Sequence, residues 1–189
     1  CMLGSVAFVL LAMNATHATD VAPEQEWFII GLLAVVVVGF GSVAFARRHR
    51  PHGAFFYILG AGILFGFTAV LVRTIAVAMK QWDPVVAFWF QVPWMPLMAI
   101  AIAGLMGQYF NQSAYSNGPP ELVIAGLTVI DPMVGVAIGI AILGELKPDV
   151  HPVVGLSMAA AAIIAIVGVV ALSRHHPDVL ARKEQRKNA

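Results

Sequence analysis

Five apolar stretches, each about long enough to cross a bilayer, constrain this chain of 189 residues more than any other feature. A membrane-spanning helix needs roughly 20 consecutive apolar residues. The chain is 60% hydrophobic and 11% charged, with a mean hydropathy of +0.85, which is typical of a polytopic membrane protein. We therefore predict an all-α transmembrane helix bundle with the lipid bilayer as its surroundings. The predicted spans are residues 27–46, 54–79, 84–107, 119–143 and 150–173.

Residues 1–13 form a sixth apolar stretch, which is too short to cross a bilayer. The stretch lacks the basic residues that open a signal peptide, and it begins at Cys1. We interpret it as the end of a helix whose start lies upstream, so that five full spans follow one truncated N-terminal span. The single cysteine excludes an intrachain disulfide and a cysteine-based metal site.

The positive charges are concentrated in two short segments. Eight of the eleven Lys and Arg residues lie in the linker 47–53 and in the tail 174–189, whereas residues 14–26 carry three acids and no Lys or Arg. Segments rich in Lys and Arg stay on the cytoplasmic side of a membrane. We expect a multi-pass protein of the plasma (inner) membrane with its linker and C-terminus in the cytoplasm. The net charge of only +1 gives no reason to expect a nucleic-acid partner.

An acid, Asp131, lies at the centre of the stretch 119–143 and is followed directly by a proline. An ionised carboxylate at bilayer depth costs about 2.5 kcal/mol or more, so such residues usually face a partner or a polar path. Pro132 cannot donate a hydrogen bond to the carbonyl of Thr128, which frees a second polar group beside the acid. We expect a broken helix here, with Asp131 binding a substrate or a proton. The alternative is that Asp131 has a structural role, in which hydrogen bonds to the backbone groups freed by Pro132, or an arginine, hold the carboxylate.

Pairs of glycines four residues apart mark helix faces on which a neighbouring backbone can come close. Gly62 and Gly66 form such a pair, and Arg73 continues the same face at helical spacing. Gly135 and Gly139 form a second pair, on the face that carries the acid. Arg73 lies about 10 Å from the middle of its helix, toward the outside. It is either a counter-ion or gate for the acid, or a side chain that extends to the external interface.

The stretch 84–107 carries Pro93 and Pro96 in mid-span, with Gln91 beside them. We expect this helix to be kinked or discontinuous. Gln91 either gives a hydrogen bond to a substrate or bonds a carbonyl that Pro93 exposes. A polar run follows and extends the helix to Asn117. Its helix-spaced members either line the inner mouth of a pathway or form a wetted helix end: Gln108, Asn111 and Gln112.

No set of residues suited to catalysis or metal binding is recognisable in the sequence. The six histidines lie in loops or at helix ends, and no two have metal-ligand spacing inside a predicted span. The sequence also lacks a phosphate-binding glycine loop and a Ser-His-Asp set that one side of the membrane would hold. We therefore expect neither an enzyme, nor a metal centre, nor a cofactor.

Three features follow one another in the second half of the chain: a small-residue turn at Ala114–Gly118, the step Asp131-Pro132, and the pair Gly144-Glu145. In this order they resemble the end of an EamA-type repeat of the drug/metabolite transporter superfamily. The resemblance covers roughly residues 54–173. It also makes Glu145, otherwise a solvated loop acid, a candidate for the substrate or proton pathway.

The superfamily that this chain resembles consists of ten-helix proteins built from two inverted five-helix repeats. They move small organic solutes across the inner membrane. On this resemblance, residues 1–46 are the end of a first repeat and residues 54–173 are the second. The chain departs from the pattern between Pro84 and Ser116, where one span and a stub fit in place of two helices. A second unit of four helices is similar to the second unit of a related magnesium-transporter-like branch of the superfamily. A complete pathway then needs the missing N-terminal half or a second copy of the chain in a homodimer.

We therefore expect a secondary transporter that moves a small organic solute by alternating access, with a proton or cation as a coupling ion. Asp131 is expected to bind the solute or the proton, with Arg73 and Gln91 as its partners. One alternative is a magnesium or other divalent-cation carrier, although the chain offers only one deep carboxylate for the ion. The other is a non-transporting scaffold subunit that assembles a complex through its glycine-rich faces.

Overall fold

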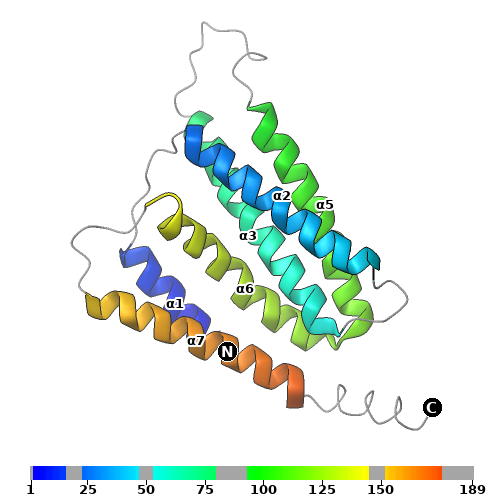
Figure 1. The fold of residues 1–189 in the computed structure, drawn as a ribbon. Coiled ribbons are helices and arrows are strands. Elements are labelled where there is room, and N and C mark those ends of the chain that lie inside the picture. The colour runs from blue at the N-terminus through cyan, green and yellow to red at the C-terminus, as the bar shows by residue number, and fades with distance from the viewer. Residues whose placement is uncertain (1, 16–22, 47–52, 80–92, 145–151, 176–189) are drawn as a thin grey trace, which may run out of the picture.

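A computed structural model of the chain describes residues 2–15, 23–46, 53–79, 93–144 and 152–175. Six α-helices account for nearly all of these residues, and no strand occurs among them. The predicted all-α fold is confirmed for this part of the chain. The helices are α1 (Met2–Ala15), α2 (Pro23–Ala46), α3 (Ala54–Met79), α5 (Trp94–Asn117), α6 (Pro120–Ala141) and α7 (Pro152–His175) (Figure 1).

Four of these helices are long and apolar enough to cross a membrane, and by length and composition they make the chain a multi-pass membrane protein. They match four of the five predicted spans. The fifth, 84–107, is not confirmed, because α5 begins at Trp94 and takes in the polar residues up to Asn117. Residues 84–92 lie outside the described residues. The four spans are Glu24–Ala46, Ala54–Val77, Pro120–Ala141 and Val153–Ala171.

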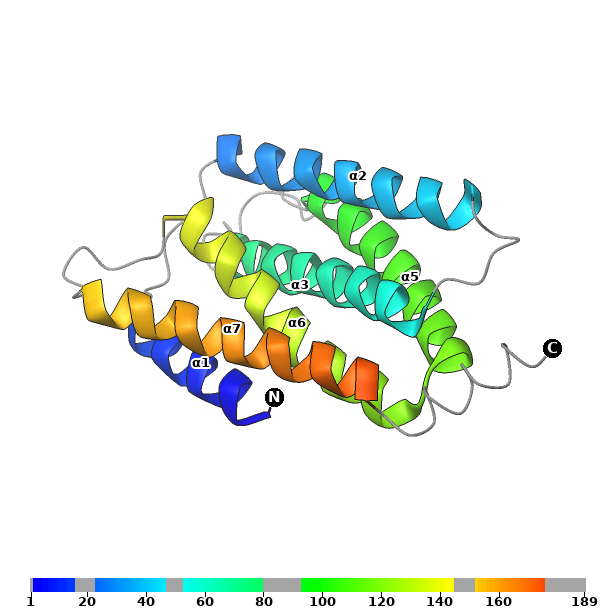
Figure 2. The ribbon, with the colours of Figure 1, turned by 60° about the horizontal axis from the view of Figure 1, so that its bottom comes forward.

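Helix α3 is the centre of the bundle (Figure 1, Figure 2). Its most extensive contacts are with α5 on one side and α6 on the other. Helix α2 lies across α3 and α5, while α1 and α7 lie side by side against α6. Helices from the two sides of the linker therefore pack against each other, because α1 and α2 both contact helices of the predicted unit 54–173.

Successive described helices run in opposite directions through the bundle (Figure 2). Helices α3 and α6 are parallel, since Ile58 meets Gly126 and, four residues further along both helices, Gly62 meets Ile130. The end of α2, the start of α3, the α5–α6 turn and the end of α7 lie toward the right in Figure 2, at one end of the bundle. This alternation agrees with the predicted topology, in which the linker and the tail share one side.

The two glycines of α3 lie where α3 and α6 pack with their backbones close together. A Cβ atom at Gly62 would be 2.6 Å from Cγ2 of Ile130. One at Gly66 would be 2.7 Å from Cβ of Val134 and 3.0 Å from the carbonyl oxygen of Asp131. Distances below 3 Å are essentially never seen for a real Cβ atom. The crossing as it stands therefore requires glycine at both positions.

Helix α6 differs from expectation in two respects. It is continuous through Pro132 rather than broken. A proline removes only one hydrogen bond, whereas a longer break would leave polar backbone groups without water inside a bilayer, so the continuous helix costs less. The close approach expected at Gly135 is not found in the described part of the chain, where a Cβ atom at this glycine would meet nothing within 4 Å. Gly139 is buried, and Gly126 packs against Ile58 instead.

Helix α5 begins directly after Pro93, with Pro96 buried in its first turn. These prolines therefore stand at the start of a helix, where the first amide groups have no intrahelical acceptor to lose. At the other end, the Gly118 N–H donates to the Ala114 carbonyl over 2.9 Å, and α6 begins at Pro120. The sequence predicts this end of α5 and this start of α6 correctly.

The glycine crossing predicts the effect of a single added methyl group. We expect Gly66→Ala to lower the free energy of unfolding by about 1–3 kcal/mol, because the methyl group must push α3 away from α6. Gly31→Ala in α2 is the matched control, since its Cβ atom meets nothing within 4 Å. Thermal unfolding of both variants in the same detergent measures the difference. Equal melting temperatures for Gly66→Ala and the wild type would contradict the tight crossing.

Candidate functional site

Asp131 lies near the middle of α6, in one of the four candidate membrane spans, and its side chain is half-buried. Its backbone is the part of α6 that faces the glycines of α3: a Cβ atom at Gly62 would be 3.6 Å from the Asp131 nitrogen. The acid is therefore held at the crossing of two membrane-spanning helices. This is a fixed position, because the backbone on either side of it is packed against Gly62 and Gly66.

The side of α6 that carries the acid is rich in hydrogen-bond acceptors. Thr128 and Gly135 lie three and four residues from Asp131 and so share its face. Thr128 is exposed, and its hydroxyl donates to the Ile124 carbonyl over 2.8 Å. Its own carbonyl has lost the amide donor that Pro132 cannot supply. Gly135 leaves open space next to these groups. A carboxylate, a carbonyl that lacks its usual helical donor and open space together suit a ligand that brings hydrogen-bond donors.

Arg73 and Asp131 lie at different levels along the α3–α6 pair. Both side chains are half-buried, but Arg73 follows Gly66 by seven residues on α3, which is about 10 Å along the helix. Because α3 and α6 are parallel, this displacement points toward the C-terminal end of α6. The structure thus keeps Arg73 on the glycine-marked face of α3 and places it about two turns away from the acid.

The polar residues of α5 lie on the other side of α3 from α6. Gln108 and Gln112 are exposed, and Asn111 is partly buried. The neighbouring Gly107 packs against Leu64 and Phe65, at about the level where Gly62 and Gly66 face the acid, so α3 separates this part of α5 from Asp131. The three polar residues lie toward the Asn117 end of α5, as the sequence predicts for an inner mouth or a wetted helix end. Two further pathway candidates, Gln91 and Glu145, lie outside the described residues.

Asn111 has a feature that sequence spacing did not indicate. Its Nδ2 donates to Oε1 of Gln108 at 3.5 Å, which is a weak hydrogen bond. Its Oδ1 is buried and has no hydrogen-bond partner among the described residues. A buried acceptor without a donor costs about 1–3 kcal/mol.

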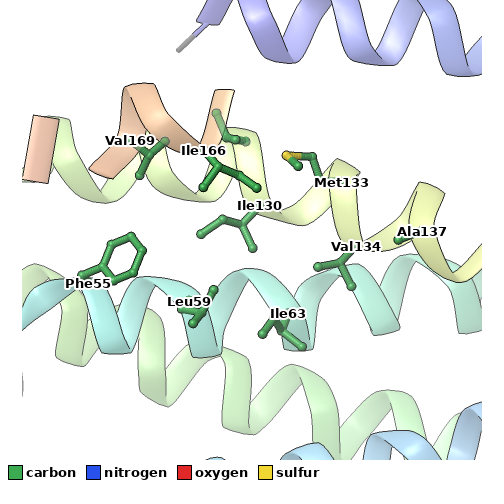
Figure 3. A pocket seen from close by; sticks show the side chains of 10 residues that line it. Phe55, Leu59, Ile63, Ile130, Met133, Val134, Ala137, Ile166 and Val169 are labelled. Atoms are coloured by element: carbon green, nitrogen blue, oxygen red, sulfur yellow. The ribbon is translucent and has the colours of Figure 1, made fainter. Parts of the chain in front are cut away.

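Two apolar cavities next to α6 were also not predicted. One of about 310 Å³ lies between α3, α6 and α7 (Figure 3), and one of about 340 Å³ lies between α1, α6 and α7. Helix α7, which the sequence presents only as an apolar span, lines both cavities. Small residues of α7 at helical spacing, Gly155, Ala159 and Ala162, line the second cavity and were the available signal. Among the described residues, no group of three or more His, Cys, Asp or Glu side chains is placed to hold a metal ion.

Comparison with known proteins gave no relative to guide the assignment. No protein-family model, no curated protein and no solved structure matches the chain.

The unpartnered oxygen predicts that Asn111→Leu stabilises the protein. Leucine has a similar volume and removes the unsatisfied acceptor, so we expect the free energy of unfolding to rise by about 1 kcal/mol. Gln112→Leu is the control, because it changes an exposed polar side chain one residue away and should have an effect within about 0.5 kcal/mol. Thermal unfolding in detergent tests both. A loss of stability in Asn111→Leu alone would mean that the oxygen has a donor in the folded protein.

Proposed function

We propose that this protein is a membrane-embedded secondary transporter for a small organic solute, and that Asp131 binds a cationic group of the solute or a coupling proton. One observation carries the proposal: a half-buried carboxylate lies in the middle of a membrane span, at the crossing of α3 and α6. Placing an ionised group at this depth costs about 2.5–3.5 kcal/mol on insertion scales, and membrane proteins rarely retain such a residue without a function.

The surroundings of the acid favour a donor-bearing solute. An ionised carboxylate only accepts hydrogen bonds, and the carbonyl of Thr128 does the same. An ammonium or guanidinium group would supply both charge and donors, whereas an anionic solute would be repelled. The open space at Gly135 lies one turn along the same face and gives such a group room to approach. The expected substrates are therefore small organic cations and zwitterions.

The bundle also suits a movement between two states. Ile130 and Val134 are seated tightly against Gly62 and Gly66, whereas apolar cavities lie between α6 and α7, so a displacement of α7 against α6 meets the least steric resistance. Alternating access needs a binding site near the middle of the membrane, at an interface between the parts that move. In this proposal the basic linker and tail face the cytoplasm of the plasma membrane, and residues 84–107 contribute a fifth span.

The resemblance to EamA-type transporters of the drug/metabolite superfamily leads to the same proposal, and it rests in part on the same step, Asp131-Pro132. It adds the expectation that a complete pathway includes further helices or a second copy of the chain. Gln108, Asn111 and Gln112 then line its inner mouth. Arg73 acts as a gate residue near the outer end of α6, and Gln91 and Glu145 remain candidates for the pathway.

Two other functions make different demands on the same residues. A divalent-cation carrier needs one or more carboxylates that hold an ion keeping several of its waters. Asp131 is the deep carboxylate of α6, and Glu121 in the same helix is exposed in its first turn. A scaffold subunit needs contact faces and no site, and it would tolerate the loss of the charge at Asp131.

Ligand-induced stabilisation of the purified protein tests the transporter proposal. A ligand that binds only the folded state at about 100 times its Kd raises the stability by about 2.7 kcal/mol. We expect at least one member of a panel of organic cations, amino acids and sugars to raise the melting temperature of the wild type. Asp131→Asn should abolish this shift, because it removes the charge and keeps the shape. Glu121→Gln is the matched control, since it neutralises an exposed acid of the same helix and should keep the shift.

Each outcome separates the three functions. Stabilisation by an organic solute that depends on Asp131 supports the transporter. Stabilisation by Mg²⁺ alone, also dependent on Asp131, replaces it with the cation carrier. If nothing in the panel shifts the wild type and Asp131→Asn melts at the same temperature, the scaffold function takes its place.

A further inference from the structure

The cavity between α3, α6 and α7 is lined only by apolar side chains in the described part of the chain. Phe55, Leu59 and Ile63 of α3 face Ile130 and Val134 of α6, and Ile166 of α7 closes one side (Figure 3). All three helices are candidate membrane spans. The cavity therefore lies between three segments that are apolar enough to cross a membrane.

The lining continues without interruption into the outer surface of α7. Ile166 lines the cavity and is also 45% exposed, and the adjacent Val167 and Ile163 are 59% and 61% exposed. In a membrane span these exposed side chains are in contact with lipid tails. A lipid tail can therefore reach the cavity directly from the bilayer, without crossing any polar group.

The size of the cavity decides what fills it. Protein interiors are close-packed, and an empty space of this size would forfeit the contacts of every side chain around it. An apolar cavity of about 150 Å³ in another protein stays free of water and binds benzene. The cavity of about 310 Å³ is roughly twice as large, so it accommodates a segment of hydrocarbon chain. Water is excluded because the lining offers no hydrogen-bond partners.

We propose that this cavity is a binding site for one acyl chain of a membrane phospholipid. The chain enters between α3 and α7 and lies against Ile130 and Val134 of α6. Met133 and Ala137 also line the second cavity, between α1, α6 and α7. Because methionine is flexible and fills irregular spaces, a rotation of Met133 allows the chain to extend from one cavity toward the other. The proposal rests on the membrane placement of the helices and not on transport.

Photo-crosslinking in nanodiscs tests this site. The probe is phosphatidylcholine with a diazirine in the middle of one acyl chain, and mass spectrometry of the digested protein locates the adducts. We expect adducts at Ile130, Met133 and Val134 to exceed those at the exposed residues Ile163 and Val167, which report contact with bulk lipid. Ala137→Phe should remove the adducts in the cavity, because the ring occupies the space, and should leave those on the outer face of α7 unchanged.

Ala160→Phe is the matched control, since Ala160 is exposed on α7 and lines neither cavity. It should keep the wild-type pattern. Ala137→Leu provides a smaller filler in case the phenylalanine variant does not fold. Labelling of the cavity no stronger than that of the outer α7 face in the wild type would overturn the proposal, whatever the variants do. So would labelling of the cavity by a diazirine fatty acid but not by the phospholipid.

Discussion

The rest of the bundle depends on the crossing of α3 and α6 through Gly62 and Gly66. In a bilayer there is little hydrophobic force between helices, so two spans associate mainly through close contact, and glycine permits the closest contact. Helix α5 packs on the opposite side of α3, and α1 with α7 packs on the opposite side of α6. The same crossing fixes the backbone of Asp131. One glycine pair therefore accounts both for the architecture and for the position of the only acid at the centre of α6.

The spans were predictable from sequence because the bilayer leaves the backbone few choices: a segment of sufficient length and apolar composition must be helical. The same argument fails for α5, where a mixed composition gives no sharp boundary and the prolines decide the start instead. The alternation of helix direction followed from the positions of the arginines and lysines, and it agrees with the structure. The helix break predicted at Pro132 was wrong, because the loss of one hydrogen bond costs less free energy than exposing a whole turn of backbone to lipid.

For the candidate site, sequence alone singled out Asp131 but not its surroundings. Helical spacing places Thr128 and Gly135 on the same face as the acid, and this is a property of one helix. Whether that face meets another helix depends on the angle at which α6 crosses α3. The spacing of residues within one helix does not predict this angle. The glycine at 135 was therefore expected at a helix contact, although it borders open space. The cavities and the unpartnered oxygen of Asn111 arise in the same way, from how whole helices are arranged.

Helix α6 belongs to two groups of helices at once. On one side it packs with α3, which also holds α2 and α5, and on the other side with α1 and α7. The contacts with α3 are tight, whereas those toward α7 include apolar voids on both sides of Met133. The bundle is thus tightly packed on one flank of α6 and loosely packed on the other. Any lateral pressure from the surrounding membrane will be taken up mainly by displacement of the α1–α7 pair, while the geometry around the carboxylate stays as the glycines set it.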